Sequence, residues 1–318
     1  MYVNPNRSAF GVPTFGKAPL IDLAQEWEAD VVVIGVPFDQ AVTFRPGTRF
    51  GSRAVRDASL RYAFFQKGTG FWDMRTETWR AQKRVVDAGD IDVIPLDYAT
   101  TYENITKAVT RIVSGGALPF VIGGDHSITE PVLRGLKDSG PITIIHFDAH
   151  TDYRHEVGGQ TIGHAQVIRR SLELPFVTRS VSLGIRAIRT DPADMRAMKE
   201  DGCIVATAAE IHRDGVNAIA DILPRDENIY VTFDIDSLDP AFAPGTGTIE
   251  TGGLNYEQAR ALLQAAIERN RLVGFDLVEV NPMLDTSGIT ATVAAQVAMD
   301  ALGFAFPGPS EPARLPED

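Results

Sequence analysis

The chain has 318 residues, of which 44% are apolar and 23% charged, a balance typical of a globular protein. Its net charge of −12 argues against sequence-independent nucleic-acid binding, which requires a basic surface, and no apolar run is long enough to span a bilayer. The single cysteine, Cys203, excludes an intramolecular disulfide framework, and we expect it to pack in the core of a cytoplasmic protein.

Along the chain, apolar β-branched runs alternate with helical patterns. The first 28 residues predict an N-terminal arm, residues 29–306 a single domain, and the proline-rich residues 307–318 a flexible C-terminal tail. Strands are predicted at 31–36, 84–87, 118–122, 142–147, 180–184, 203–206, 228–233 and 272–279. Helices are predicted at 53–64, 102–113, 129–136, 164–172, 192–200, 216–222, 256–269 and 289–302.

The predicted strands are nearly continuous runs of Val, Ile and Phe. Such strands are buried on both faces, which indicates an α/β fold with a mostly parallel sheet covered by helices. Ligands of such sheets lie beyond the carboxyl ends of the strands. Polar residues that directly follow these strands are therefore the first candidates for a functional site.

Three short motifs occupy this position: Gly-Gly-Asp-His at 123–126, Asp-Ala-His-Thr-Asp at 148–152 and Asp-Ile-Asp at 234–236. Residues two apart in extended backbone point the same way, so each motif can direct its polar side chains toward one point. Burying four carboxylates together is unfavourable unless cations neutralise them. We therefore predict a two-metal site with these ligands: His126, Asp148, His150, Asp152, Asp234 and Asp236.

The donor types indicate which metal the site prefers. Mostly oxygen ligands with two histidines suit Mn²⁺ best, with Ni²⁺, Co²⁺ or Zn²⁺ as alternatives. The remaining histidines rank lower. His146 lies inside a predicted strand and is expected to be a buried core imidazole, and His155 and His212 are expected on loops or the surface. His164 follows the metal motifs at a predicted helix start, where either a proton-transfer role or an ordinary helix-start residue is consistent with the spacing.

These motifs, together with Asp-Leu-Val-Glu-Val-Asn-Pro at 276–282, resemble the ureohydrolases, the superfamily of arginases and agmatinases. Gly-Val-Pro-Phe-Asp at 35–39 and Arg-Pro-Gly-Thr-Arg-Phe-Gly at 45–51 resemble the agmatinase branch. The resemblance extends from about residue 31 to residue 302. It implies a three-layer α/β/α fold with an eight-stranded, mostly parallel sheet, and a single ureohydrolase catalytic domain. It also implies two Mn²⁺ per subunit and a homotrimer or homohexamer.

The resemblance further implies roles for individual residues. One ion would bind His126, Asp148, Asp152 and Asp234, and the other Asp148, His150, Asp234 and Asp236, so that Asp148 and Asp234 bridge them. His164 matches the catalytic histidine of the family and Glu279 its guanidinium-binding glutamate. The expected reaction is hydrolysis of a guanidino C–N bond by a metal-bridging hydroxide that Asp152 orients, which releases urea and an amine.

Departures from the family pattern leave the substrate open. The usual His-Gly-Thr is His164-Ala165-Gln166 here, and Arg154 stands where relatives contact the substrate tail. Arginine at this spacing occurs in formimidoylglutamate hydrolases and suits a carboxylate, although a solvent-facing arginine fits equally well. Agmatine, guanidino acids such as guanidinobutyrate or guanidinopropionate, and unusual guanidines or biguanides such as metformin therefore all remain candidates.

Two alternative hypotheses for the function also remain. A catalytically silent subunit, which would pair with a paralogous partner, is disfavoured by the intact ligands and by His164 and Glu279. A one-zinc deacetylase of the same fold is disfavoured by the second-metal ligands His150 and Asp236.

Overall fold

The computed structural model describes residues 11–62, 70–80 and 83–306 of the chain. An eight-stranded sheet forms the centre of the molecule, in the order β4-β1-β5-β10-β9-β6-β7-β8, and every recorded pair in it is parallel. Its strands are β1 (Val31–Gly35), β4 (Val85–Asp90), β5 (Leu118–Ile122), β6 (Ile142–Phe147), β7 (Val177–Ile185), β8 (Ile204–Thr207), β9 (Asn228–Asp234) and β10 (Arg271–Val278).

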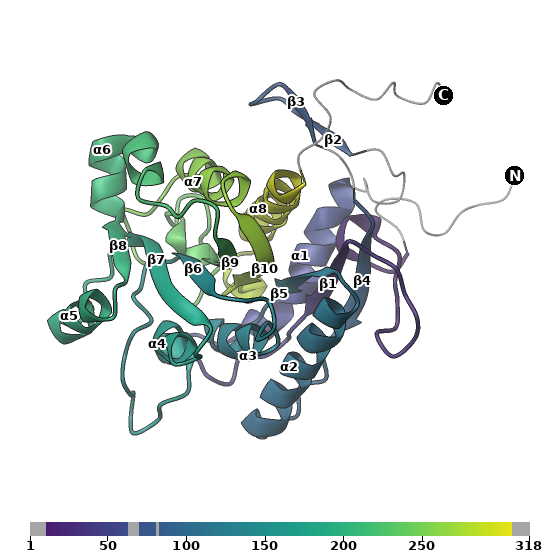
Figure 1. Ribbon diagram of the computed structural model, residues 1–318, viewed down its shortest axis with the longest axis horizontal. Coiled ribbons are helices and arrows are strands. Elements are labelled where there is room, and N and C mark those ends of the chain that lie inside the picture. Colours follow the sequence, from purple (N-terminus) through teal and green to yellow (C-terminus); the bar gives the residue numbers. More distant parts are fainter. Residues whose placement is uncertain (1–10, 63–69, 81–82, 307–318) are drawn as a thin grey trace, which may run out of the picture.

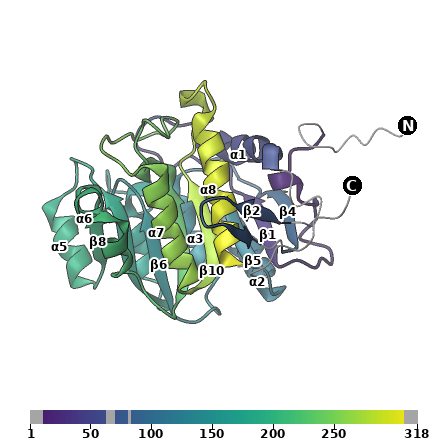
Figure 2. The same cartoon turned by 90° about the horizontal axis from the view of Figure 1, so that it is seen from above.

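Helices cover both faces of the sheet (Figure 1). One face packs against α1 (Gly51–Ser59), α6 (Ala208–Ala220), α7 (Tyr256–Glu268) and α8 (Ile289–Ala305). The other face packs against α2 (Tyr98–Ser114), α3 (Thr129–Arg134), α4 (Val167–Leu172) and α5 (Pro192–Glu200). Figure 2 looks onto the first of these layers, in which α7 and α8 cross the centre of the sheet. The predicted three-layer α/β/α fold is thus confirmed.

Alternation along each strand divides the core into two parts. In β1, for example, Val31 and Val33 belong to the apolar cluster under α7 and α8, whereas Val32 and Ile34 belong to the cluster under α2 and α3. All four are fully buried, so the strand lacks a polar face, as expected for a central parallel strand. The segment before β1 also contributes, because Phe15 is fully buried in the first cluster and its ring lies 6.1 Å from the tilted ring of Phe120.

The observed elements follow the predicted ones closely in the sheet but differ in two places. A two-stranded antiparallel hairpin, β2 (Phe71–Asp73) with β3 (Thr78–Arg80), was not predicted, because strands of three residues show no alternating pattern. Helix α6 begins at Ala208 rather than at residue 216. Thr207 and Glu210 form a capping box at its start, and Gly215 (φ 81°) interrupts the helical pattern that the sequence presents.

Short 3₁₀ helices follow several strands and carry polar residues of the candidate site: η5 (His126–Ile128), η6 (His164–Gln166) and η7 (Ile235–Ser237). The other described 3₁₀ helices are η1 (Phe15–Lys17), η2 (Thr48–Phe50), η3 (Leu60–Tyr62) and η8 (Pro282–Leu284). The predicted C-terminal tail, residues 307–318, lies outside the described residues. Within the described part of the chain, no helix has the length and apolar character needed to cross a membrane.

Candidate metal centre and pocket

Four neighbouring strands, β5, β10, β9 and β6, end at the same edge of the sheet and bring the sequence motifs together. After β5, Asp125 caps η5 by accepting a hydrogen bond from the Ser127 N–H (3.0 Å), and its other oxygen accepts one from the Ala41 N–H (2.9 Å). Gly124 is required here because a Cβ would lie 1.8 Å from the Phe38 carbonyl oxygen. This tight turn fixes the backbone of His126.

The first group of donors surrounds His126, whose side chain is 1% exposed. Its Nδ1 lies 3.1 Å from Asp148 Oδ2, 3.1 Å from Asp152 Oδ2 and 3.3 Å from Asp234 Oδ2. Despite these three oxygens, Nδ1 has no hydrogen bond of acceptable geometry, while Nε2 lies 2.8 Å from the Thr232 hydroxyl. The nitrogen and the carboxylate oxygens therefore converge on one small volume without donating to one another.

The second group surrounds His150. Its Nδ1 lies 3.3 Å from Asp148 Oδ1 and 3.2 Å from Asp236 Oδ2. Asp148 therefore faces both groups, with Oδ2 toward His126 and Oδ1 toward His150. Asp234 faces the first group through Oδ2, and its Oδ1 accepts the Asp236 N–H (2.8 Å) at the start of η7.

His146, by contrast, is hydrogen bonded at both ring nitrogens. Nε2 lies 2.8 Å from Asp148 Oδ2 and Nδ1 lies 3.0 Å from the Ser182 hydroxyl, and the residue is fully buried. The prediction of a core imidazole is thus confirmed. Although its Nε2 is close enough to belong to the first donor group, His146 orients Asp148 from behind, as partners of metal-binding carboxylates commonly do.

The two groups have the dimensions of a pair of metal sites. Ligands about 2.1 Å from a cation lie about 3 Å apart in neighbouring octahedral positions, close to the 3.1–3.3 Å between the donors here. Four aspartates and two imidazoles also match the donors of a site for two divalent cations. The donor set therefore fits a binuclear divalent metal centre.

The electrostatics of the groups lead to the same assignment. Burial and the neighbouring carboxylates of Asp236 and Asp148 raise the pKa of Asp234 well above its usual value. Burial opposes the charged form of His126 too, but three carboxylates raise the pKa of its imidazole. His150 behaves in the same way, with a pKa of about 12. The cluster thus has a strong affinity for positive charge.

Glu279 has a strained backbone. Its φ of 63° lies in the left-handed region, which residues other than Gly, Asn and Asp rarely adopt, and its side chain is buried. Asp152 (φ 47°) lies in the same region, which aspartate tolerates better. The conformation of Glu279 costs of order 1–3 kcal/mol and persists only where the surroundings enforce it, which is typical of functional sites.

His164 lies beside the metal donors and is held from two sides. Its Nδ1 lies 3.3 Å from Glu279 Oε1, the oxygen that also accepts the His126 N–H (2.9 Å). Its Nε2 accepts the Thr43 N–H (3.1 Å) and lies 3.0 Å from the Thr43 hydroxyl. Burial lowers the pKa of His164, but the carboxylates of Glu279, Asp152 and Asp125 outweigh it and raise the pKa to about 9.

Arg186 stabilises the backbone around the second donor group. Its guanidinium donates to the carbonyl oxygens of Gly184, Asp236, Ser237, Leu238 and Glu250 at 2.7–3.2 Å. The arginine therefore links the end of β7 to the segment that carries Asp236. Sequence reasoning missed Arg186, because carbonyl oxygens provide no side-chain pattern that could have revealed it.

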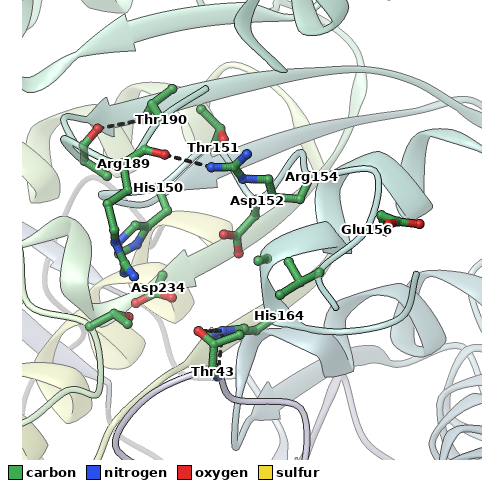
Figure 3. Close-up of a pocket in the computed structure, with 14 residues that line it drawn as sticks. Thr43, His150, Thr151, Asp152, Arg154, Glu156, His164, Arg189, Thr190 and Asp234 are labelled. Atoms are coloured by element: carbon green, nitrogen blue, oxygen red, sulfur yellow. Dashed lines mark hydrogen bonds between the residues drawn. The ribbon is translucent and has the colours of Figure 1, made fainter. Parts of the chain in front are cut away.

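A cavity of about 400 Å³ opens onto the donors (Figure 3). Its walls are formed by Thr43, His150, Thr151, Asp152, Arg154, Glu156, Val157, His164, Ala165, Ala187, Arg189, Thr190, Asp234 and Thr248. Glu279 is buried and contacts His164, but it is not one of these wall residues. Thr43 and Arg189 were not predicted from the sequence, since each lies in a loop without a motif.

Arg154, which the sequence proposes as a substrate contact, is engaged by the protein. Its Nη1 lies 3.2 Å from Asp191 Oδ2 and its Nε lies 3.3 Å from Asp194 Oδ2, at the start of α5. Its Nη2 donates to the Arg189 carbonyl oxygen (2.9 Å). Arg154 therefore lines the cavity while its charge is balanced by two carboxylates.

The family model described as "Arginase family" matches residues 29–303. The chain is 36% identical over 302 residues to agmatinase from Cronobacter sakazakii, covering 93% of this chain and 92% of that protein. It is 33% identical over 299 residues to guanidinobutyrase from Pseudomonas aeruginosa, covering 92% of each. The structure of proclavaminate amidino hydrolase from Streptomyces clavuligerus superposes with a TM-score of 0.82 at 32% identity, over 95% of this chain and 99% of that one.

Proposed function

Since this chain belongs to the arginase family, in its agmatinase-like branch, we propose that six side chains bind the two divalent cations of its hydrolytic site. The protein is a binuclear-metal hydrolase that acts on the C–N bond of a guanidino compound. The observation that supports our ligand assignment is the convergence of carboxylate oxygens on His126 Nδ1 and His150 Nδ1, at 3.1–3.3 Å. None of the oxygens near His126 Nδ1 forms a well-aligned hydrogen bond with it.

One cation would be held by His126, Asp148, Asp152 and Asp234, and the other by Asp148, His150, Asp234 and Asp236. Asp148 supports the bridging role directly, because its two oxygens face different histidines. The predominance of oxygen donors favours Mn²⁺, with Ni²⁺ and Co²⁺ as alternatives.

The two cations supply Lewis acidity, which makes a water molecule a strong nucleophile at neutral pH. Asp152 lies at the cavity wall and orients that water toward the guanidino carbon. Glu279 binds the planar guanidinium through Oε2, because its Oε1 is already occupied by the His126 N–H and by His164. The guanidino carbon is thereby held for attack on one face of its plane, which lowers the entropic part of the barrier.

His164 delivers a proton to the leaving amine nitrogen. It lines the cavity, and Glu279 at Nδ1 stabilises its imidazolium form. The contact between the Thr43 N–H and Nε2 fixes the ring orientation when the imidazole is neutral. The products are urea, or a urea derivative, and an amine.

Urea release by the protein loaded with Mn²⁺, and separately with Ni²⁺, tests this assignment. We expect His164→Asn to lower kcat about 10²- to 10⁴-fold with both metal ions still bound, as for loss of a general acid. Glu279→Gln should mainly weaken guanidinium binding. If His164→Asn retains full activity, or if the loaded protein releases urea from no guanidino compound, the proposed roles are wrong.

The relatives do not decide the substrate tail, since their names include agmatinase, guanidinobutyrase and a human mitochondrial guanidino acid hydrolase, 35% identical over 279 residues. For the assembly we propose a cytoplasmic homotrimer or homohexamer. Light scattering of the purified protein tests the subunit number, and a monomer would contradict it.

A further inference from the structure

The cavity wall contains an arginine that pairs with no carboxylate in the described part of the chain. Arg189 lies in the loop between β7 and α5 and lines the cavity, and Figure 3 shows its guanidinium turned toward His150 and Asp234. Within the described part of the chain, no carboxylate lies within ion-pair distance of this guanidinium. A cation is therefore positioned beside the metal donors and is available to a ligand.

The loop that carries Arg189 is held by hydrogen bonds at its backbone. Arg154 donates to the Arg189 carbonyl oxygen (2.9 Å) and is itself held by Asp191 and Asp194. The Thr190 hydroxyl donates to the Ala187 carbonyl oxygen (2.8 Å), which closes a turn around Arg189. A guanidinium on a fixed loop loses less conformational entropy when it binds a ligand.

Charge balance indicates what the tail of the ligand should be. Four carboxylates of the metal site and two divalent cations cancel, so the loaded site presents no net negative charge to the tail. Of the residues around the cavity, Arg154 is neutralised by Asp191 and Asp194.

The carboxylate of Glu156 points away from the metal donors and from Arg189 (Figure 3). Glu250 lies 3.7 Å from His150 Nε2 and can balance that imidazole. Arg189 is then the arginine of the cavity wall whose charge no described carboxylate balances.

We propose that Arg189 binds a carboxylate on the substrate tail and that Arg154 positions the loop, so that the enzyme selects an ω-guanidino carboxylate over a guanidino amine. This inference rests on the proposed function, which places the guanidinium end at Glu279 and the metal ligands. Arginine suits this role because its planar guanidinium binds a carboxylate through two parallel hydrogen bonds. An ammonium tail would be repelled by the same group.

The test compares three guanidines of similar length: guanidinobutyrate with an anionic tail, butylguanidine with a neutral tail and agmatine with a cationic tail. Two readouts are needed for the Mn²⁺-loaded protein: kcat/KM from urea release, and the dissociation constant from calorimetry. A charge-assisted hydrogen bond predicts that guanidinobutyrate is preferred over butylguanidine by roughly 10- to 150-fold, with agmatine weakest.

The variants separate the charge of Arg189 from the charge of the whole protein. Arg189→Ala should abolish the preference for the anionic tail, and Arg189→Glu should reverse it in favour of agmatine. The control is Arg213→Glu, an exposed arginine on α6 that pairs with Asp214 and lies outside the cavity. It changes the net charge equally and should leave the preference unchanged. Since Arg189 is exposed, its variants should keep the thermal stability of the parent.

The outcomes distinguish this inference from the proposed function. If the parent releases urea but prefers agmatine, or if Arg189→Glu keeps the parent's preference, our inference is wrong while the proposed function stands. If no urea appears but guanidinobutyrate binds and Arg189→Glu loses that binding, the proposed hydrolysis is wrong while Arg189 is still the group that binds the carboxylate. Arg154→Ala should weaken binding of guanidinobutyrate less than Arg189→Ala, because it acts only through the loop.

Discussion

Two clusters of buried charged side chains differ in how their charges are balanced. At the hairpin β2–β3, Asp73 pairs with Arg80 and Arg260, and Arg260 also reaches Asp300 at 3.2 Å. The two buried carboxylates and the two guanidinium groups cancel within the protein, and Arg80 also pairs with the partly exposed Glu268 (2.8 Å). At the metal centre, the ion-pair contacts of four carboxylates are made with imidazoles rather than with guanidinium groups.

The pKa values of one carboxylate from each cluster, Asp73 and Asp234, shift in opposite directions. Burial opposes ionisation of Asp73, but the Thr76 hydroxyl, the Arg75 N–H and the Arg260 guanidinium outweigh it and hold its pKa below the usual value. The pKa of Asp234 is raised instead. A buried ionic cluster whose charges balance within the protein thus serves the fold, whereas a cluster with an excess of one sign can receive a ligand of opposite charge.

The largest effect is expected from a substitution that disrupts the metal centre. Asp148→Asn removes the carboxylate that faces both histidines. We expect loss of both bound metal ions and a fall of urea release to background, measured by elemental analysis and by a urea assay. The matched change Asp73→Asn should leave the metal content intact. Two bound metals per subunit in Asp148→Asn would contradict the bridging role.

The next largest effect is expected at the buried cluster beside the hairpin β2–β3. Asp73→Asn leaves Arg80 and Arg260 without their shared carboxylate, and both side chains are about 5% exposed. Removing one partner of a buried ion pair typically costs about 3–5 kcal/mol. Urea denaturation should therefore show a large loss in the free energy of unfolding. A loss below about 1 kcal/mol would mean that water replaces the lost carboxylate.

Added metal should stabilise the protein through the metal centre and not through the cluster at Asp73. Free Mn²⁺ at one hundred times its dissociation constant should raise the free energy of unfolding by about 2.7 kcal/mol. Scanning calorimetry with and without a chelator measures this increment. Asp73→Asn should retain it, and Asp148→Asn should lose it. An equal response in both variants would show that Mn²⁺ acts elsewhere on the protein.

The smallest effect is a difference in pH dependence, measured with a chelator present. The lowered pKa of Asp73 contributes stability above its unfolded-state pKa, and this contribution disappears as the pH falls through the folded-state value. The raised pKa of Asp234 has the opposite sign, since it favours the folded state at low pH and this contribution is lost as the pH rises through the raised value.

Unfolding of Asp73→Asn and Asp234→Asn across the acid range compares the two groups. Near neutral pH, Asp73→Asn should be less stable than the parent and Asp234→Asn at least as stable. Both differences should shrink as the pH falls. If Asp234→Asn is less stable than the parent at neutral pH in chelator, its carboxylate is a structural group rather than a metal ligand.

The sequence predicted the central sheet well, and it predicted which polar residues gather at one edge of that sheet. Buried parallel strands have a distinct composition, and each proposed ligand lies at or beyond the end of such a strand, so the topology itself brings His126, Asp148 and Asp234 to one edge. The proximity of these residues therefore follows from strand direction alone.

The residues that surround the substrate could not be predicted in the same way. Thr43 reaches His164 from 121 positions away, and Arg186 acts through backbone carbonyls. Arg154 was noticed from its spacing, but its engagement by Asp191 and Asp194 depends on how α5 packs. Loop geometry and helix placement are tertiary properties, and no local pattern encodes them.

The strand order also has a consequence for biosynthesis. In the sheet, β10 and β9 lie between β5 and β6, although they are the last two strands of the sheet to be synthesised. His126 follows β5 and Asp148 follows β6, so a growing chain holds these residues long before the strands that set their spacing exist. Pairing of such distant segments is slow and comes late. Metal uptake therefore belongs after translation is nearly complete, and a ribosome-bound chain that ends before Arg271 should not yet bind the metal pair.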